Sequence, residues 1–596
     1  MKKVIALILA VTMLAATAVG CTTLEKDATG EDYDKGAIID MYLTTEIYNF
    51  DPQLSVTDDA MLKIFSLCFE GLTRINEDGK WEPALMKKYK IDQDDEEAFR
   101  ILVELNNTRW SDGRTVQAAD IVYSWKRILE PDATSEAASL LYDIKNARAV
   151  KVGDATIDDL GIAAVDTYTL EIEFEQKVDL DQFFENCSSI ALVPVREDVI
   201  TRYDGGVWAQ KSTTVVTNGP FSPKEIVYGN TLRLERSPYY YLDEEKEEHL
   251  DKYVIPYRLL TKYNVGNAEA QLASLPIGGI FYDGEIPLSA RVQYQGSAVI
   301  DDMMGTHTYV FNTKNELFAK PEVRRALSLA IDRNQIVSIV TYAKPATGYI
   351  PYKVFDTTSG TSFRTTGGDV ISASANMSEA QSLLDSAGVK SGAFTLSIRD
   401  NEVDKAIADY VAGVWGQLGF TVTVETVAAT PNTADSTIYV DNFQNKYDTG
   451  DFDVIGIDMM MLSADAFSAL SQFAVTFSGN GVDMDSENYD LYGHISGYVS
   501  EEYNALIETA FAEKDRAARA TILHEAEKLL MNDMPVMPII FLQDAYLYTD
   551  VLSGITSTYY GTRDFSRTKM KDYMTYKAKT DTTADTTAET TAPAAQ

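Results

Sequence analysis

The sequence predicts an α/β fold in two lobes, and three observations support this prediction. Short β-rich runs alternate with helical stretches from Ala37 onward, a pattern typical of layered α/β folds. A second strand and helix series between residues 378 and 459 predicts a separate lobe. A strand-like run after the last long helix predicts that the chain then re-enters the first lobe. Two lobes joined in this way are expected to enclose a ligand by closing about a hinge.

The first lobe is predicted from three strands and one helix. The strand-like runs are IIDMYLT, FRILVELN and TLEIEFEQ, at residues 38–44, 99–106 and 169–176. The stretch AADIVYSWKRIL, which follows Gln117, predicts a helix. In the sequence WSDG we expect a sharp turn, with Trp110 packed beneath it, Asp112 accepting backbone donors and Gly113 in a glycine-type conformation.

The second lobe is predicted to begin with a packed amphipathic helix over residues 321–342, with Pro321 in its first turn. Four charged residues on that helix are expected to form ion pairs on its solvated face: Arg324, Arg325, Asp332 and Arg333. Further elements follow, as helix 378–388, strand 394–400, helix 403–418, strand 420–427, strand 452–459 and one long helix over 501–532. The strand VMPIIFLQDAYLY, residues 536–548, comes after the helix-breaking Pro535.

Composition excludes some classes of function. The 596 residues contain 52 Lys and Arg against 90 Asp and Glu, a formal charge of -38, which repels nucleic acids and anionic lipid headgroups. The four histidines show no metal-ligand spacing, so we expect no metal and no cofactor. A nucleophile motif and a phosphate loop are also missing, and a binding protein is favoured over an enzyme. A pair of catalytic carboxylates stays open as an alternative.

The two ends of the chain differ from its body. Lys2 and Lys3 precede the apolar run 4–20, which predicts a signal peptide. The tetrapeptide Ala-Val-Gly-Cys that ends at Cys21 resembles a bacterial lipobox, which implies a lipid anchor on Cys21 at the outer face of the cell membrane. Cys68 and Cys187 are either paired or free. The predicted division is a signal peptide at 1–20, a flexible tether at 21–36, lobe I at 37–65, 165–302 and 540–578, an extra subdomain of lobe I at 66–164, lobe II at 303–539 and a disordered tail at 579–596.

Four blocks of sequence resemble one known family. They are FDPQLSVTDDAMLKIFSLCFEGLTRINEDGKWEPAL at 50–85, TRWSDGRTVQAADIVYSWKRILEP at 108–131, TNGPF at 217–221 and YVFNTKNELFAKPEVRRALSLAIDR at 309–333. The chain thereby resembles the family 5 extracellular solute-binding proteins, which include the oligopeptide- and dipeptide-binding components of bacterial ABC importers. The resemblance implies a periplasmic-binding-protein-like fold of type II, cluster C. It also implies capture of a short peptide by hinge closure and delivery to the permease subunits of an ABC importer.

The resemblance further implies that two segments from opposite lobes sandwich the ligand, at residues 55–59 and 458–465. The candidate ligand-binding residues are therefore Val56, Thr57, Asp58, Asp59, Tyr309, Asp458, Met459, Met460, Met461, Leu462 and Asp465. Peptide-binding relatives use an aspartate here for the α-ammonium of the peptide, and on that alignment Leu462 replaces it. Asp458, Asp465, Asp58 and Asp59 are the possible substitutes. A non-peptide solute, such as a sugar or a metal chelate, and a peptide sensor or receptor on the same scaffold stay open as alternatives.

Overall fold

The computed structural model describes residues 24–26, 32–34, 36–53, 58–95, 98–203, 206–240, 253–357, 360–483, 490–491 and 493–572. The predicted signal peptide, Cys21 and the predicted tail at 579–596 lie outside these residues. Inside the predicted tether, β1 (Leu24–Lys26) and β2 (Asp32–Asp34) form a two-stranded antiparallel sheet. That residues 21–36 act as a flexible tether stays a prediction.

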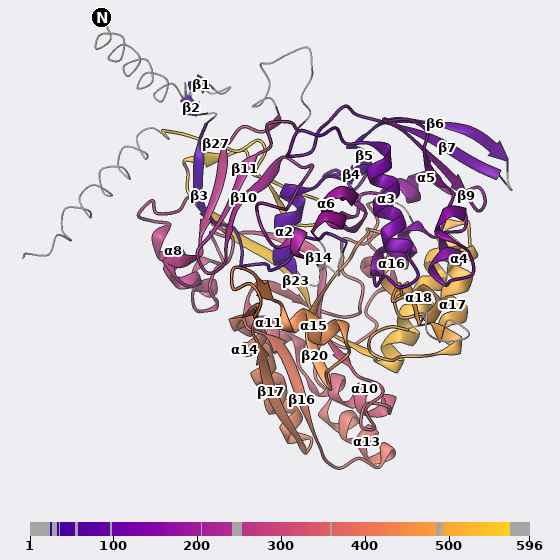
Figure 1. Cartoon of the computed structure of the whole chain (residues 1–596). Helices are drawn as coiled ribbons and strands as arrows, with labels where there is room; N and C mark the ends of the chain where they lie inside the picture. Colours follow the sequence, from indigo (N-terminus) through magenta and orange to yellow (C-terminus); the bar gives the residue numbers. More distant parts are fainter. Residues whose placement is uncertain are drawn as a thin grey trace, which may run out of the picture.

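A sheet of eleven strands runs through the centre of the described chain (Figure 1). β15 (Ala343–Pro345) pairs with β23 beside its main path. The main path, in order, is β10 (Phe221–Val227), β11 (Thr231–Arg236), β12 (Arg258–Lys262), β3 (Ile38–Tyr42), β13 (Tyr282–Asp283), β23 (Val536–Tyr548), β14 (Val299–Phe311), β20 (Val454–Met460), β16 (Gly392–Arg399) and β17 (Phe420–Val427).

Two long strands connect the two lobes. β14 and β23 have 13 residues each and pair in an antiparallel register. β23 also pairs with β13, through Tyr548 and Tyr282, so the chain returns to the half of the sheet that contains β3. The register of β14 against β23 shifts between Asp302 and Thr306, which marks an irregularity in the ladder. The lobe boundaries predicted at 302/303 and 539/540 fall within these two strands.

A second, antiparallel sheet of four strands covers one end of the molecule, at the upper right of Figure 1. Its order is β6 (Met86–Asp95), β7 (Ala98–Leu105), β9 (Thr169–Phe174) and β8 (Ile162–Ala164). β7 and β9 alternate buried and half-buried residues, as a strand with one face on a core does. β9 lies beyond the subdomain boundary predicted at residue 164. On the same side of the molecule lie β4 (Thr73–Ile75), β5 (Trp81–Pro83), α3 (Ala118–Leu129), α4 (Ala147–Lys151), α5 (Leu180–Asn186) and α6 (Glu197–Arg202). α2 (Asp59–Cys68) packs against β10 of the large sheet.

The turn at WSDG has the predicted form. Trp110 is fully buried and its indole nitrogen donates a hydrogen bond of 2.9 Å to Asp120. The Asp112 carboxylate accepts from the Arg114 backbone at 3.1 Å, and Gly113 has a φ of 92°, which favours glycine. The motif is thus a structural turn. Its residues lie outside the cavity described below.

The predicted single helix over 321–342 is two helices. α10 (Pro321–Ala330) ends before α11 (Arg333–Val340), and the Asp332 side chain caps α11 by accepting from the backbone of Asn334 and Gln335. The apolar spacing continues across the break, but an aspartate cap competes with helix continuation, and here the cap prevails. The other helices of this lobe are α12 (Phe363–Gly367), α13 (Met377–Ala387), α14 (Glu402–Gln417) and α15 (Asn442–Asp448).

The prediction of a solvated charged face on these helices is wrong for two residues. Arg324 and Arg333 are 3% and 1% exposed. Arg333 donates to the backbone oxygens of Pro538, Ser328 and Ser372, and Arg324 donates to those of Asp533, Met534 and Phe318. A guanidinium has five donors, so it can satisfy several buried carbonyl groups where chain segments meet.

The predicted helix over 501–532 is also divided. α17 (Glu501–Ala512) and α18 (Arg516–Asp533) are separated at residues 513–515, and Asp515 caps α18 by accepting from the Ala518 backbone at 2.8 Å. Near them lies α16 (Ala466–Ser471), and elsewhere are α8 (Ala268–Ser274) and α9 (Arg291–Tyr294). The remaining strands form short pairs: β18 (Thr430–Pro431) with β19 (Tyr439–Val440), β21 (Val482–Asp483) with β22 (Asp490–Leu491), β24 (Leu552–Ser553) with β27 (Lys569–Met570) and β25 (Thr556–Ser557) with β26 (Arg563–Asp564).

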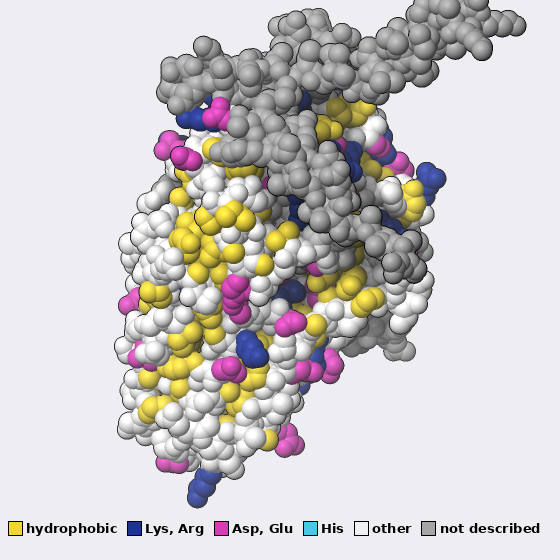
Figure 2. Space-filling model, turned by 90° about the vertical axis from the view of Figure 1, so that its left-hand side faces the viewer, with side chains coloured by type: hydrophobic (Ala, Val, Ile, Leu, Met, Phe, Trp, Pro, Cys, Tyr) yellow, Lys and Arg dark blue, Asp and Glu magenta, His cyan; other side chains and the backbone are white. Residues whose placement is uncertain are grey.

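The structure also bears on the cysteines, on the surface charge and on the length of the helices. Cys68 and Cys187 are both free and buried, which resolves the alternative left open by the sequence. Acidic side chains are spread over the surface drawn in Figure 2, in keeping with the negative net charge. Within the described residues, the helices are all too short or too polar to cross a membrane.

Candidate functional site

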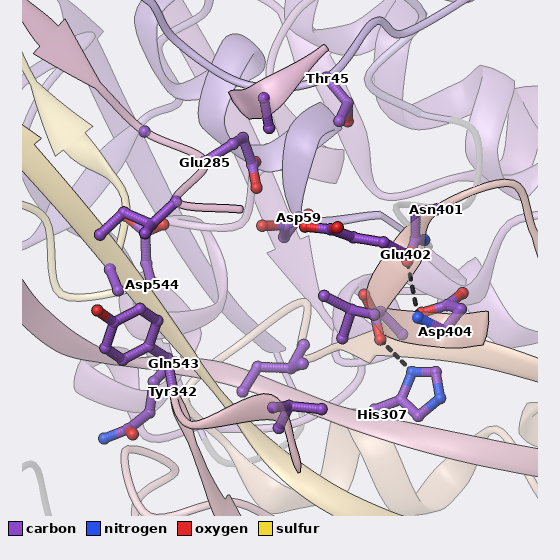
Figure 3. A pocket seen from close by; sticks show the side chains of 18 of the residues that line it. Thr45, Asp59, Glu285, His307, Tyr342, Asn401, Glu402, Asp404, Gln543 and Asp544 are labelled. Atoms are coloured by element: carbon purple, nitrogen blue, oxygen red, sulfur yellow. Dashed lines mark hydrogen bonds and ion pairs between the residues drawn. The ribbon is translucent and has the colours of Figure 1, made fainter. Parts of the chain in front are cut away.

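A cavity of about 450 Å³ lies where the two lobes meet (Figure 3). Figure 3 shows Asp59 and Glu285 together on one side of it and Asp404 and His307 together on the other. Pockets of this size are ordinary for small ligands. The residues that line the cavity are Tyr42, Thr45, Asp58, Asp59, Lys63, Asn267, Ala268, Glu269, Gly284, Glu285, Ile286, Arg291, Met303, His307, Val340, Tyr342, Arg399, Asp400, Asn401, Glu402, Val403, Asp404, Ile407, Asp458, Ile540, Leu542, Gln543, Asp544 and Ala545.

The wall from lobe I is built around one buried lysine. Lys63, one turn after the start of α2, is 6% exposed. Its ammonium lies 2.8 Å from Asp59, 3.1 Å from Glu285 and 3.0 Å from Asp544. Burial lowers the pKa of Lys63, but the three carboxylates outweigh burial and hold this pKa well above its ordinary value. One ammonium thus neutralises part of a three-carboxylate cluster at every physiological pH.

The wall from lobe II is built from two paired strands and the start of a helix. His307 on β14 stands opposite Asp458 on β20, and its Nδ1 lies 2.7 Å from the Asp458 carboxylate. Burial lowers the pKa of His307, but the hydrogen bond to Asp458 and the charge of Asp404 together raise it above 6.5. Asp404 lies in the first turn of α14, which Asn401 caps at 2.8 Å. Burial raises the pKa of Asp404 to about 6, although His307 partly offsets this effect.

An ion pair joins the two walls. Arg399, at the end of β16, lies 3.4 Å from Asp58 of lobe I and 3.3 Å from Asp441 of lobe II. The Asp58 side chain also caps α2, by accepting from the Ala60 backbone at 2.7 Å. Burial raises the pKa of Asp58 to about 7, Arg399 lowers it in part and Asp59 raises it further. Burial lowers the pKa of Arg399, but Asp58 and Asp441 outweigh burial and raise it.

A second set of contacts joins the lobes beside the cavity. Tyr439 of lobe II stacks on Tyr48 of lobe I, with ring centroids 5.6 Å apart and planes 20° apart. Tyr228 of lobe I packs on the same ring at 5.1 Å. Lys211 of lobe I pairs with Asp435 of lobe II. The lobes are therefore in contact at these residues as well as at Arg399, and the structure represents a closed arrangement.

The cavity is strongly acidic. Nine carboxylate side chains line it, against three side chains of Lys or Arg. One of the three, Arg291, is hydrogen-bonded to the backbone: its guanidinium donates to the oxygens of Ile286 and Val340 at 3.0 and 2.9 Å. A cavity with this charge balance favours a ligand that carries positive charge.

The predicted site residues are divided between the cavity and the core. Asp58, Asp59 and Asp458 line the cavity. Val56 and Thr57 lie outside the described residues. The others are absent from the cavity wall: Tyr309 is fully buried against Trp415, and Met459, Met460, Met461 and Leu462 belong to the hydrophobic core with 3% to 6% exposure.

Asp465 has a structural partner. Its carboxylate forms two hydrogen bonds with Arg519, at 3.0 and 2.8 Å, and it caps α16 by accepting from the Phe467 backbone at 3.1 Å. This buried pair lies at the small neighbouring pocket beside α16 and α18, away from the wall of the main cavity.

Several cavity residues were not predicted from the sequence, among them Lys63, Glu285, His307, Arg399, Asp404 and Asp544. One signal for part of this group was available. The charged run RDNEVD at 399–404 starts in the last two residues of the predicted strand FTLSIRD and continues into the next helix, and ligands of α/β proteins commonly bind where strands end.

Comparison with known proteins places these features in context. Residues 80–481 match the family model described as bacterial extracellular solute-binding proteins, family 5. The dipeptide-binding protein DppE of Bacillus subtilis is 27% identical over 556 residues, which cover 91% of this chain and 94% of the relative. The oligopeptide-binding protein OppA of the same organism is 25% identical over 558 residues, with the same coverage. The structure of OppA from Burkholderia pseudomallei superposes with a TM-score of 0.73 at 24% identity, covering 90% of this chain and 99% of that one.

Proposed function

Because the chain belongs to the bacterial extracellular solute-binding proteins of family 5, we propose that it captures short peptides or peptide-like solutes for an ABC importer. The observation that carries the proposal is the cavity, whose wall is built from both lobes and bridged by Arg399 and Asp58. A ligand bound there contacts both lobes, so its binding energy favours the closed arrangement over the open one. The protein supplies binding and closure, and other subunits of the importer supply ATP hydrolysis.

The names of the relatives support the ligand class. DppE and OppA of B. subtilis are named for binding dipeptides and oligopeptides, and both align over most of their length with this chain. The cavity has room for a small ligand, and its polar lining suits a solute with charged ends. Short peptides at neutral pH have such ends.

Three further parts of the proposal concern location and movement. We propose that Cys21 carries a lipid anchor that holds the protein at the outer face of the membrane. The closed form is recognised there by the permease subunits. We also propose that the hinge lies where β14 and β23 pass between the lobes, near residues 302 and 540, because the register irregularity of β14 lies at the same place.

Native mass spectrometry of the full chain, purified without denaturation, tests the proposal. We expect a series of co-purified masses that fit short peptides, since the protein would retain ligand through purification. One discrete mass that fits a sugar or a metal chelate would keep the solute-binding function and reject the peptide class. If the chain is purified empty, titration calorimetry with di-, tri- and tetrapeptides replaces this measurement, and a complete lack of binding would reject the proposal.

A further inference from the structure

The carboxylates of the cavity are not equally neutralised. Lys63 forms ion pairs with Asp59, Glu285 and Asp544, and Arg399 forms ion pairs with Asp58 and Asp441. Arg291 donates to backbone oxygens. These contacts occupy all three basic side chains of the cavity wall. Asp458 is left with the imidazole of His307, and Asp404 forms no ion pair of its own and feels His307 and Arg399 only at longer range.

Asp404 is a buried carboxylate of the cavity wall. It is 7% exposed, and within the described chain no Lys or Arg nitrogen lies within ion-pair distance of it. The neighbouring Asn401 side chain accepts a hydrogen bond of 2.8 Å from the Asp404 backbone and carries no charge. Burial of an ionised carboxylate without a cationic partner is unfavourable in free energy, and for the same reason burial raises the pKa of Asp404. A cation delivered by a ligand would remove the cost.

A second observation at the same place also points to a ligand. His307 is 2% exposed, and its Nδ1 is engaged with Asp458. Its Nε2 is buried and lacks a hydrogen-bond partner among the described residues. Native proteins rarely leave such a group unsatisfied unless a ligand or water completes it. Asp404, which has no ion pair with Lys or Arg in the described chain, and His307, whose Nε2 has no partner there, both belong to the wall of the cavity.

Of the described residues in the predicted segment 458–465, Asp458 alone lines the cavity. Leu462, where the family resemblance implies an aspartate, is buried in the core at 6% exposure. Asp465, the nearest acid after it, is bound to Arg519 by two hydrogen bonds. Neither residue lines the cavity. A cationic ligand group must therefore be held somewhere else.

We propose that Asp404, supported by Asp458 and His307, holds an ammonium group of the ligand, so that the cation anchor lies at the start of α14. In the complex His307 is neutral: its Nδ1–H donates to Asp458, and its Nε2 is free to accept from the ammonium. This inference rests on the proposed function and specifies its ligand: a peptide-like solute that brings an unpaired positive charge to the lobe II wall. A carboxylate at this position would face two acids and be repelled. The ammonium is either the α-ammonium of a peptide or the side chain of a lysine residue in it.

Titration calorimetry with three tripeptides separates these sources. The first peptide is lysine-alanine-alanine, the second has norleucine in place of lysine, and the third is the lysine peptide with an acetylated N-terminus. Loss of the ammonium that Asp404 holds is expected to weaken binding about 10- to 100-fold, as for hydrogen bonds to charged groups. In Asp404→Asn the lysine peptide and the peptide that lacks the ammonium held in the wild type are expected to bind within about twofold of each other.

Asp409→Asn is the matched control, because Asp409 is an exposed acid on the same helix outside the cavity wall. It is expected to keep the discrimination of the wild type. Ratios of affinity within one variant are compared, so a partly unfolded preparation does not change the result. Asp458→Asn, which should weaken the discrimination, replaces Asp404→Asn if that variant does not fold.

Three outcomes would overturn the inference. If the wild type binds all three peptides equally, peptide capture stands and the cation anchor is rejected. If the wild type discriminates and Asp404→Asn discriminates equally well, the anchor lies at another residue. If the wild type binds no peptide, the proposed function itself fails, and the inference fails with it.

Discussion

The guanidinium of Arg399 lies 3.4 Å from the carboxylate of Asp58, and this ion pair spans the two lobes at the wall of the cavity. Arg399 is the last residue of β16, and Asp58 is the cap of α2. Both side chains are only 18% and 16% exposed, so water screens the pair less than it screens a surface pair. The pair exists only when the lobes are together, which gives closure a measurable electrostatic component.

Arg399→Gln should shift the protein toward the open arrangement. The variant loses the ion pairs to Asp58 and to Asp441, so we expect a larger radius of gyration in small-angle X-ray scattering without ligand. Peptide affinity should fall about tenfold, equivalent to about 1.4 kcal/mol. Lys405→Gln, an exposed cation three residues into α14, is the control and should leave both quantities unchanged. An unchanged radius in Arg399→Gln would mean that closure depends on other contacts.

Tyr439→Ala tests the aromatic contact between the lobes. The ring of Tyr439 packs on Tyr48 and Tyr228, and each aromatic pair contributes about 0.5–1.5 kcal/mol. We expect the variant to open in scattering experiments and to bind peptide more weakly. Tyr439→Phe keeps the ring and should behave like the wild type. If both substitutions have the same effect, the hydroxyl group and not the ring carries the contact.

Asp465→Asn distinguishes a structural role from ligand binding. Asparagine caps a helix as well as aspartate does, so this change removes mainly the charge opposite Arg519. Breaking a buried ion pair by removing one partner costs about 3–5 kcal/mol, and urea unfolding should show a loss of this order. Peptide affinity of the folded variant should stay unchanged.

Asp515→Asn is the matched control for this experiment, since Asp515 caps α18 from an exposed position. It should cost less than about 0.5 kcal/mol. A loss of peptide binding in Asp465→Asn without a loss of stability would indicate that Asp465 contacts the ligand.

Stability should fall as the pH rises from the ordinary carboxyl range toward neutral and slightly alkaline values. Burial raises the pKa of four carboxyl groups to about 7 and of two to about 6: Asp58, Glu136, Glu185 and Asp283, and Asp143 and Asp404. Above the ordinary carboxyl range the folded state therefore binds more protons than the unfolded state. The free energy of unfolding then decreases as the pH rises through these values. His307, whose pKa is also raised, contributes in the same direction above pH 6.5.

Calorimetry gives the readout for this dependence. We expect a lower Tm at about pH 8 than at about pH 5.5, in the absence of ligand. The pKa of Asp59 is lowered, so the opposing effect of this residue is confined to pH values below the ordinary carboxyl range. Glu136→Gln, which is neutral at every pH, should reduce the slope. A Tm that increases over this interval would contradict the prediction.

The same lobes show how far local sequence patterns predict the fold. The strands at 38–44, 394–400 and 536–548 correspond to β3, β16 and β23, because β-rich apolar runs identify strands without knowledge of their neighbours. The helix ends at Asp332 and Asp515 were missed, since apolar spacing continues across both breaks while an aspartate cap ends the preceding turn. The sequence pattern predicts Arg324 and Arg333 in solvent for a related reason: the carbonyl groups that accept their hydrogen bonds belong largely to segments distant in the sequence.

The sequence by itself determined the family, the strand and helix content and the acidic character of the protein, because motifs, periodicity and charge are local or additive properties. Tertiary structure decided which acids act together. Asp404 joins His307 and Asp458 only because β14 and β20 pair in register and α14 begins beside them. Asp465 leaves the cavity only because α18 brings Arg519 to it. The interaction of two charges depends on their distance in the folded structure. Folding of a chain of 596 residues brings together groups that no local sequence pattern relates.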